Sequence, residues 1–104
     1  MACDMTPLLA FVEILVDSSS NSDDVAGALS QLPNVVELYK VSGEFDIVTL
    51  VSTRDIDEFH NLLHKKILKI KGVRTEVSSV VLDANKGPLS KCNTPTTISQ
   101  AISG

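Results

Sequence analysis

The chain has few aromatic residues, few cysteines and no long apolar run, and each shortage excludes a class of protein. It contains three Phe, one Tyr and no Trp among 104 residues, so Val, Leu and Ile must form most of its core. The two cysteines, Cys3 and Cys92, lie near opposite ends without metal-type spacing, as free thiols of a cytoplasmic protein do. No apolar run approaches the roughly 18 residues of a membrane span. A signal peptide requires Lys or Arg before its apolar run, and none precedes the first apolar run here. We expect a cytoplasmic protein that does not enter the membrane.

Basic residues are also scarce, which argues against a nucleic-acid-binding surface. The chain has nine Lys and Arg residues but 13 Asp and Glu residues, and the formal net charge is −4. All 13 acidic residues fall within residues 1–83, whereas Lys86 and Lys91 follow that segment. A phosphate backbone requires clustered Lys and Arg, and the one basic cluster, within residues 65–71, lies at a helix end, where cations complement the helix dipole. We therefore expect no direct contact with nucleic acid.

The apolar residues predict one folded domain with a short extension and a tail. An apolar content of 43% is typical of a globular domain, and a chain of this length can bury a single modest core. We assign residues 1–7 to an N-terminal extension and residues 8–83 to the domain. Residues 84–104 are small, polar and interrupted by Pro88 and Pro95, so we expect a flexible C-terminal tail.

Hydrophobic periodicity predicts the element order β-α-β, turn, β-α-β. Strands are expected at residues 8–16, 35–41, 47–52 and 73–82. Pro33 ends the first helix, and Gly72, which tolerates a left-handed conformation, closes the second. The second helix begins at Asp55-Ile56-Asp57-Glu58, which has the spacing of a capping box. Two split βαβ units of this kind form a ferredoxin-like α+β sandwich, with a four-stranded antiparallel sheet and both helices on one face.

The first strand is apolar on both of its faces. Val12 and Ile14 lie on one face, and Phe11 and Leu15 lie on the other. Helices can cover one face of such a sheet, whereas an antiparallel sheet with one wet face would show alternating polarity. We expect the second face to pack against another copy of the chain, which predicts a homodimer.

The second helix carries the only residues with metal-ligand spacing. His60 and His64 are four positions apart, but Asn61 stands where a zinc protease would have Glu, and no third ligand is evident. We interpret both as surface histidines. The sequence also has no phosphate-binding Gly loop and no nucleophile elbow. We expect no metal, no cofactor, no catalytic residue and no enzymatic activity.

The turn at residues 41–47 is the place where a small polar ligand could bind. Gly43 permits close backbone approach, Asp46 offers an acceptor for an ammonium group, and Ser42 could donate to a carboxylate. The alternative is purely conformational, with Gly43 supplying a positive φ and Asp46 capping the turn through local bonds. The residues alone favour this alternative, because hairpin turns are rich in these residue types.

Three short motifs together resemble the C-terminal effector domain of the Lrp/AsnC transcriptional regulators, also called the RAM domain. They are Gly-Glu-Phe-Asp-Ile at residues 43–47, Gly-Val at 72–73 and Val-Val-Leu at 80–82. The likeness covers about residues 8–83. It implies a sandwich that dimerises through its sheets into an α/β barrel-like pair, and dimers that assemble into octamers or decamers. It also implies an effector amino acid bound between dimers, beside the turn and the start of the last strand.

The candidate ligand-binding residues are Ser42, Gly43, Phe45, Asp46, Glu76 and Ser78. Gly43 and Asp46 match the motif of the resembled family, and Ser78 matches a Thr. Glu76 departs from the family pattern, because it stands where a second Thr is usual and adds negative charge beside a carboxylate site. Phe45 replaces a frequent Tyr, which removes a hydroxyl group and retains the packing surface.

Seven residues precede the first expected strand, whereas Lrp/AsnC regulators carry an N-terminal helix-turn-helix. We therefore expect a stand-alone RAM protein: a non-catalytic module that binds an amino acid or related metabolite. It would assemble with full-length Lrp/AsnC regulators, or with an enzyme whose activity follows nutrient level. One alternative is a structural assembly module that needs no ligand. The other is a small dimeric ferredoxin-like enzyme, which would need a deep pocket within one subunit.

Overall fold

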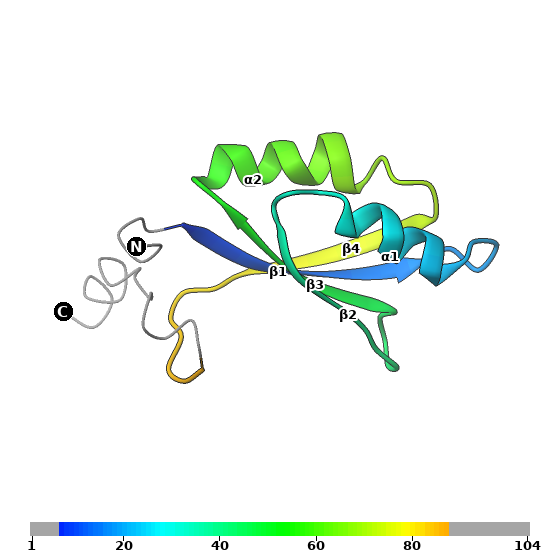
Figure 1. The fold of residues 1–104 in the computed structure, drawn as a ribbon, viewed down its shortest axis with the longest axis horizontal. Helices are drawn as coiled ribbons and strands as arrows, with labels where there is room; N and C mark the ends of the chain where they lie inside the picture. The colour runs from blue at the N-terminus through cyan, green and yellow to red at the C-terminus, as the bar shows by residue number, and fades with distance from the viewer. Residues whose placement is uncertain (1–6, 88–104) are drawn as a thin grey trace.

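The computed structural model describes residues 7–87, which form one antiparallel sheet with helices on one face (Figure 1). The strands lie in the order β2-β3-β1-β4, so β3 and β1 are central. The elements are β1 (Leu8–Val16), α1 (Ser22–Ser30), β2 (Val35–Lys40), β3 (Ile47–Thr53), α2 (Ile56–Leu62), its π-helical continuation η2 (Leu63–Ile67), and β4 (Val73–Val80). The predicted α+β ferredoxin-like sandwich is confirmed.

Residues 1–6 and 88–104 lie outside the described part of the chain. They include Cys3, Cys92 and most of the predicted extension and tail, so the predictions about those segments stay predictions. Among the helices of residues 7–87, none is long and apolar enough to cross a membrane.

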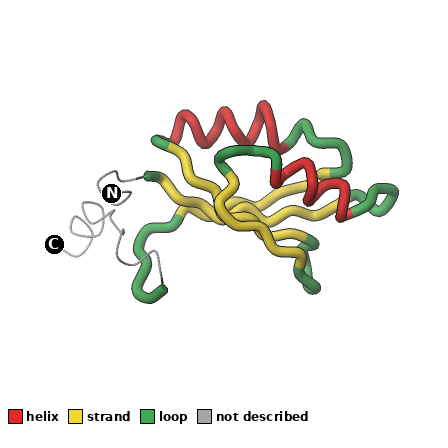
Figure 2. The backbone as a smooth tube through the Cα atoms, in the orientation of Figure 1, coloured by secondary structure: helices red, strands yellow, loops and turns green. Residues whose placement is uncertain are grey.

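The core lies between the helices and the inner face of the sheet, the two layers coloured red and yellow in Figure 2. The sheet register places Val12 opposite Thr49 and Ile14 opposite Ile47, with all four side chains fully buried. Thr49 is tolerated there because its hydroxyl group donates to the Val12 carbonyl oxygen at 3.1 Å. The buried apolar cluster consists of Ala10, Val12, Ile14, Val25, Leu29, Ile47, Val51, Phe59, Leu62, Leu63 and Ile67.

Side-chain caps begin both helices. Asn21 is the N-cap of α1, and its Oδ1 accepts from the Asp23 N–H at 2.7 Å. Asp55 is the N-cap of α2, and its Oδ1 accepts from the Glu58 N–H at 2.8 Å. Such caps satisfy main-chain donors that have no partner inside the helix. The predicted start of the second helix is therefore confirmed.

The predicted end of the second helix is wrong. The helix ends at Ile67 rather than at Gly72, and Gly72 instead begins the return to β4. Gly72 has φ +102°, and a Cβ atom built on it would lie 2.7 Å from Cγ2 of Val25. Its carbonyl oxygen accepts from the Asp17 N–H at 2.7 Å. Glycine is needed here for the close approach of this loop to α1. The last strand also ends earlier than predicted, at Val80.

No helix of residues 7–87 lies on the outer face of the sheet (Figures 1 and 2), and this face carries exposed apolar side chains. Phe11 is 43% exposed, Tyr39 55% and Val77 47%. Leu50 pairs with Phe11 and lies on the same face, yet it is 2% exposed. The outer face therefore carries large apolar side chains, as the pattern of the first strand predicts, together with Glu13 and Glu37.

Candidate functional site

The candidate site is built around the loop between β2 and β3. The Val41 N–H donates to the Asp46 carbonyl oxygen at 2.9 Å and closes the loop. The connection is wider than the predicted tight turn, because β2 ends at Lys40 and β3 begins at Ile47. Ser42, Gly43 and Glu44 at its tip are exposed, whereas Phe45 and Asp46 are half-buried.

Asp46 fixes this loop to the end of β1. Its N–H donates to the Ile14 carbonyl oxygen at 2.9 Å. Its Oδ2 accepts from the Val16 N–H at 2.8 Å, across a sequence separation of 30 residues. Asp46 therefore caps the loop through long-range bonds rather than through the local bonds of the conformational alternative. Within residues 7–87, no hydrogen bond to its other carboxylate oxygen is found, and the side chain is half-buried.

Gly43 has the positive φ that the conformational alternative predicts, +154°. A Cβ atom built on Gly43 would meet no atom within 4 Å. The glycine is therefore required by the backbone conformation and not by crowding within the protomer. The open space beside it is compatible with close approach by another molecule.

The two predicted residues of β4 lie across β1 from the loop. Glu76 pairs with Ile14 and Ser78 with Val12. Because Ile14 and Val12 belong to the core, both β4 side chains lie on the helix-facing side of the sheet, where they are half-buried. Glu76 therefore lies level with the end of β1 that anchors the loop, whereas Ser78 lies level with the middle of β1, and β1 separates both from the loop. Within the described chain, no hydrogen bond joins the loop to Glu76 or Ser78.

Two clefts that the sequence did not predict lie elsewhere. One, of about 410 Å³, lies between the N-terminal end of α1 and the loop before β4. Its lining is Ser19, Ser20, Asn21, Asp24, Ala28, Ile70 and Lys71. The other, of about 140 Å³, lies beside α2 and is lined by Asn34, Glu58, Asn61, Leu62, Lys65 and Lys66. The six predicted ligand residues line neither cleft. The Ser- and Asn-rich loop before α1 is the sequence feature that could have indicated the larger cleft. The same residues are also explained by the capping of that helix.

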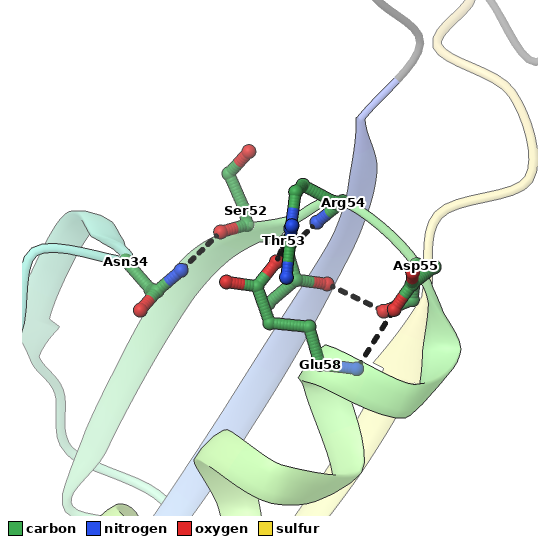
Figure 3. Close-up of polar contacts among 6 residues, drawn as sticks. All are labelled: Asn34, Ser52, Thr53, Arg54, Asp55 and Glu58. Carbon is green, nitrogen blue, oxygen red and sulfur yellow. Dashed lines mark hydrogen bonds and ion pairs between the residues drawn. The ribbon is translucent and has the colours of Figure 1, made fainter.

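A polar network joins the end of β3 to the start of α2 (Figure 3). Oε1 of Glu58 accepts from the Arg54 main-chain N–H at 2.6 Å and from Arg54 Nε at 3.1 Å. These hydrogen bonds and the adjacent guanidinium lower the pKa of Glu58 below its ordinary value. Asn34 Nδ2 donates to the Ser52 carbonyl oxygen at 2.9 Å and ties the start of β2 to the same region. Each of these contacts has a structural role in holding the strand-to-helix connection.

The predicted surface histidines are exposed. The ring centroids of His60 and His64 lie 6.2 Å apart in an edge-on arrangement. Within residues 7–87, no group of three or more His, Cys, Asp or Glu side chains is placed to hold a metal ion.

The fold is a ferredoxin-like α+β sandwich whose β2–β3 loop is anchored to β1. A family model described as the Lrp/AsnC ligand binding domain matches residues 9–88. This chain therefore belongs to the Lrp/AsnC ligand-binding domain family, and the resemblance found in the sequence is confirmed.

The chain is similar to parts of two kinds of curated protein. It is 33% identical over 79 residues to the HTH-type transcriptional regulator FL11 of Pyrococcus furiosus, a match that covers 76% of this chain and 51% of FL11. It is 32% identical over 73 residues to a homocitrate synthase of Saccharolobus islandicus, covering 70% of this chain and 16% of the synthase. The chain thus spans about half the length of the regulator that it matches.

Solved structures of transcriptional regulators have the same fold. E. coli AsnC superposes with a TM-score of 0.73 at 25% identity, covering 77% of this chain and 54% of AsnC. The regulator NMB0573 of Neisseria meningitidis, solved as a complex with L-Met, superposes with a TM-score of 0.72 at 25% identity. That match covers 81% of this chain and 58% of NMB0573.

Proposed function

We propose that this chain is a non-catalytic module that binds an amino acid or a related small metabolite and assembles with copies of itself. The observation that carries this proposal is the anchored loop. Asp46 is held by β1 through two hydrogen bonds, and this keeps a carboxylate and the exposed main chain at Gly43 in a fixed relation. An amino-acid ligand requires an acceptor for its ammonium group and N–H or O–H donors for its carboxylate. Asp46 supplies the former, and Ser42 with the loop main chain supplies the latter.

The outer face of the sheet supports dimerisation. Phe11, Tyr39 and Val77 are exposed on this face, which they share with Glu13 and Glu37, and exposed large apolar side chains gathered on one face favour a protein partner. A second copy of the same face provides an equally apolar and self-complementary partner, as a two-fold dimer requires. Face-to-face packing of the two sheets covers these side chains.

The ligand site is completed by further assembly. One protomer supplies the loop on one side of β1 and the half-buried Glu76 and Ser78 on the other. A neighbouring dimer would close the site over this end of the sheet, and rings of dimers would give octamers or decamers. The L-Met complex of NMB0573 supports an amino acid as the class of ligand.

The module has two candidate partners. The first is a full-length Lrp/AsnC regulator, and this proposal implies that the chain shares the cytoplasmic location of such a regulator. The match to part of homocitrate synthase favours a second candidate, an enzyme whose activity follows the level of the ligand. The net acidic charge of −4 argues against direct DNA binding in either case.

A panel of the twenty amino acids at millimolar concentration tests the proposal. Thermal shift reports binding, and native mass spectrometry reports oligomeric state in the same samples. We expect at least one amino acid to raise the melting temperature and to bind with defined stoichiometry. Failure of every amino acid to bind, with assembly intact, would favour the ligand-independent assembly module instead.

Matched variants then locate the site. Asp46→Asn removes the loop charge and retains an oxygen that can accept from Val16, and we expect it to weaken ligand binding by about tenfold or more. Glu44→Gln removes one charge from the exposed tip of the same loop and should leave affinity nearly unchanged. Equal effects of the two changes would contradict a specific role for Asp46.

A further inference from the structure

Two neighbouring imidazole rings lie on the surface of the helix layer. His60 belongs to α2 and His64 to its continuation η2, which lie above the sheet in Figure 1. Their ring centroids are 6.2 Å apart, and both residues are exposed. Neither ring forms a hydrogen bond or an ion pair within residues 7–87. The ring nitrogens of both histidines can therefore bind a group from solution.

The spacing of the two histidines brings their rings within reach of a single metal ion. Residues four positions apart lie on the same side of a helix, one turn from each other. A transition-metal ion lies about 2.0–2.1 Å from an imidazole nitrogen and therefore about 3.2 Å from the ring centroid. One ion thus joins two rings whose centroids are up to about 6.4 Å apart. The observed separation of 6.2 Å falls inside this limit, and exposed side chains can rotate to bring the rings closer.

The helix is distorted at the second histidine. The Leu68 N–H donates to the carbonyl oxygen of Leu63, five residues earlier, at 2.9 Å. The segment Leu63–Ile67, which contains His64, is accordingly a π-helical turn. Such turns are rare inside helices and are frequently found at functional sites. The distortion is independent of the ring spacing and points to the same place on the helix.

We propose that His60 and His64 together bind one divalent transition-metal ion, of the class of Ni²⁺, Zn²⁺ and Cu²⁺, with water completing the coordination. These ions prefer imidazole nitrogen, whereas Mg²⁺ and Ca²⁺ prefer oxygen ligands. A two-histidine site needs no third side chain, which agrees with the absence of any group of three or more ligand side chains within residues 7–87. The site lies on the helix layer and not on the β2–β3 loop, so it does not rest on the proposed amino-acid ligand.

The charges around the pair permit a cation and limit how tightly it binds. Asp57 lies one turn before His60, and Lys65 and Lys66 directly follow His64. All three are exposed, so water and salt screen the repulsion between the lysines and a bound ion. We expect weaker binding than at a closed site of four protein ligands, and a strong dependence on both rings.

Titration of the untagged full-length chain with metal chlorides by isothermal titration calorimetry tests the proposal. We expect one Ni²⁺ per chain, affinity that falls in the order Ni²⁺, Co²⁺, Mn²⁺, and no binding of Mg²⁺. Because the chain has only two histidines, paramagnetic Ni²⁺ should broaden the NMR signals of both imidazole rings at low occupancy. Broadening that leaves both rings unaffected would show that the ion binds elsewhere.

Matched variants separate chelation by the pair from binding by a single ring. His60→Asn and His64→Asn should each weaken Ni²⁺ binding by about tenfold or more, because the second imidazole binds intramolecularly at high effective concentration. His64→Asn combined with Asn61→His retains two histidines at adjacent positions, which do not face each other on a helix. This control should bind Ni²⁺ as weakly as the single variants. Cys3 and Cys92 are present in every variant, so any contribution from their thiols is common to all titrations.

Each contrary result overturns the proposal without touching the amino-acid site. Unchanged Ni²⁺ affinity in either single variant would mean that the two rings do not act together. A control that binds as tightly as the unmodified chain would contradict the need for a spacing of four. Failure of the unmodified chain to bind Ni²⁺ at millimolar concentration would exclude the site. All three substituted positions are exposed, and circular dichroism checks the fold. If a variant does not fold, the NMR signals of the unmodified chain decide the question.

Discussion

The carboxylate of Asp46 accepts a hydrogen bond from the main-chain N–H of Val16 at 2.8 Å, so the principal ligand candidate is also a structural anchor. The bond holds the β2–β3 loop against the end of β1, together with the bond from the Asp46 N–H to Ile14. Any substitution of Asp46 therefore acts on the loop as well as on a ligand. The two effects can be separated by choosing which part of the side chain is removed.

Asp46→Ala should destabilise the domain more than Asp46→Asn does. Alanine leaves the partly buried Val16 N–H without its acceptor, which typically costs about 1–3 kcal/mol. Asparagine keeps an acceptor oxygen and loses only the charge, so its cost should be smaller. Urea unfolding of both variants measures the difference. Equal stabilities would indicate that water replaces the carboxylate at no cost.

Phe11→Glu should separate the proposed dimer without unfolding the protomer. Phe11 is 43% exposed on the outer face of the sheet, and a carboxylate there would be buried without a partner in a face-to-face dimer. We expect the dissociation constant of the dimer, measured by analytical ultracentrifugation, to rise by about tenfold or more. Ile56→Glu is the control, because Ile56 is equally exposed but begins α2 on the opposite layer. A dimer that survives Phe11→Glu would place the interface elsewhere.

Substitution by alanine should have opposite effects on the stability of the domain at Gly72 and at Gly27. Gly72→Ala places a Cβ 2.7 Å from Val25 at φ +102°, and we expect it to destabilise the domain by more than ~1 kcal/mol. Gly27 lies within α1, where an added Cβ meets nothing within 4 Å. Gly27→Ala should therefore stabilise the domain by about 0.5–1 kcal/mol. Thermal unfolding of both variants measures the contrast, and a harmless Gly72→Ala would contradict the close packing.

The fold could be predicted because its signals are local. Alternating apolar residues mark the strands, and Asp55 with Glu58 marks the start of α2, where the structure has the expected cap. The predicted end of that helix is wrong because residues 68–71 contain no strong helix breaker before Gly72. The chain leaves the helix at Ile67 in order to return to β4, whose place is fixed by pairing with the distant β1.

The candidate site could be predicted only in part. The identity of Gly43 and Asp46 followed from turn chemistry, and Gly43 has the positive φ that such a turn requires. The partner of Asp46 is a main-chain N–H 30 residues earlier, and no local pattern encodes that contact. The burial of Oε1 of Glu76 depends on the pairing of β4 with β1 and on the packing around both. These are tertiary properties, which neither residue type nor spacing reveals.

Glu58 should make the stability of the domain depend on pH. Hydrogen bonds from the Arg54 main-chain N–H and guanidinium lower the pKa of its carboxyl group in the folded state. A carboxyl group with a depressed folded-state pKa stabilises the fold above its unfolded pKa of about 4.3, and that stabilisation is lost as the pH falls through the folded value. Glu58→Gln should therefore lower the urea midpoint at neutral pH, and its difference from the unmodified protein should shrink as the solution is acidified. Glu44→Gln provides the control, because its exposed carboxylate accepts no hydrogen bond within residues 7–87 and the difference should stay small at every pH. A Glu58→Gln difference that stays constant through the acid range would show that packing of the side chain, and not its charge, supports the start of α2.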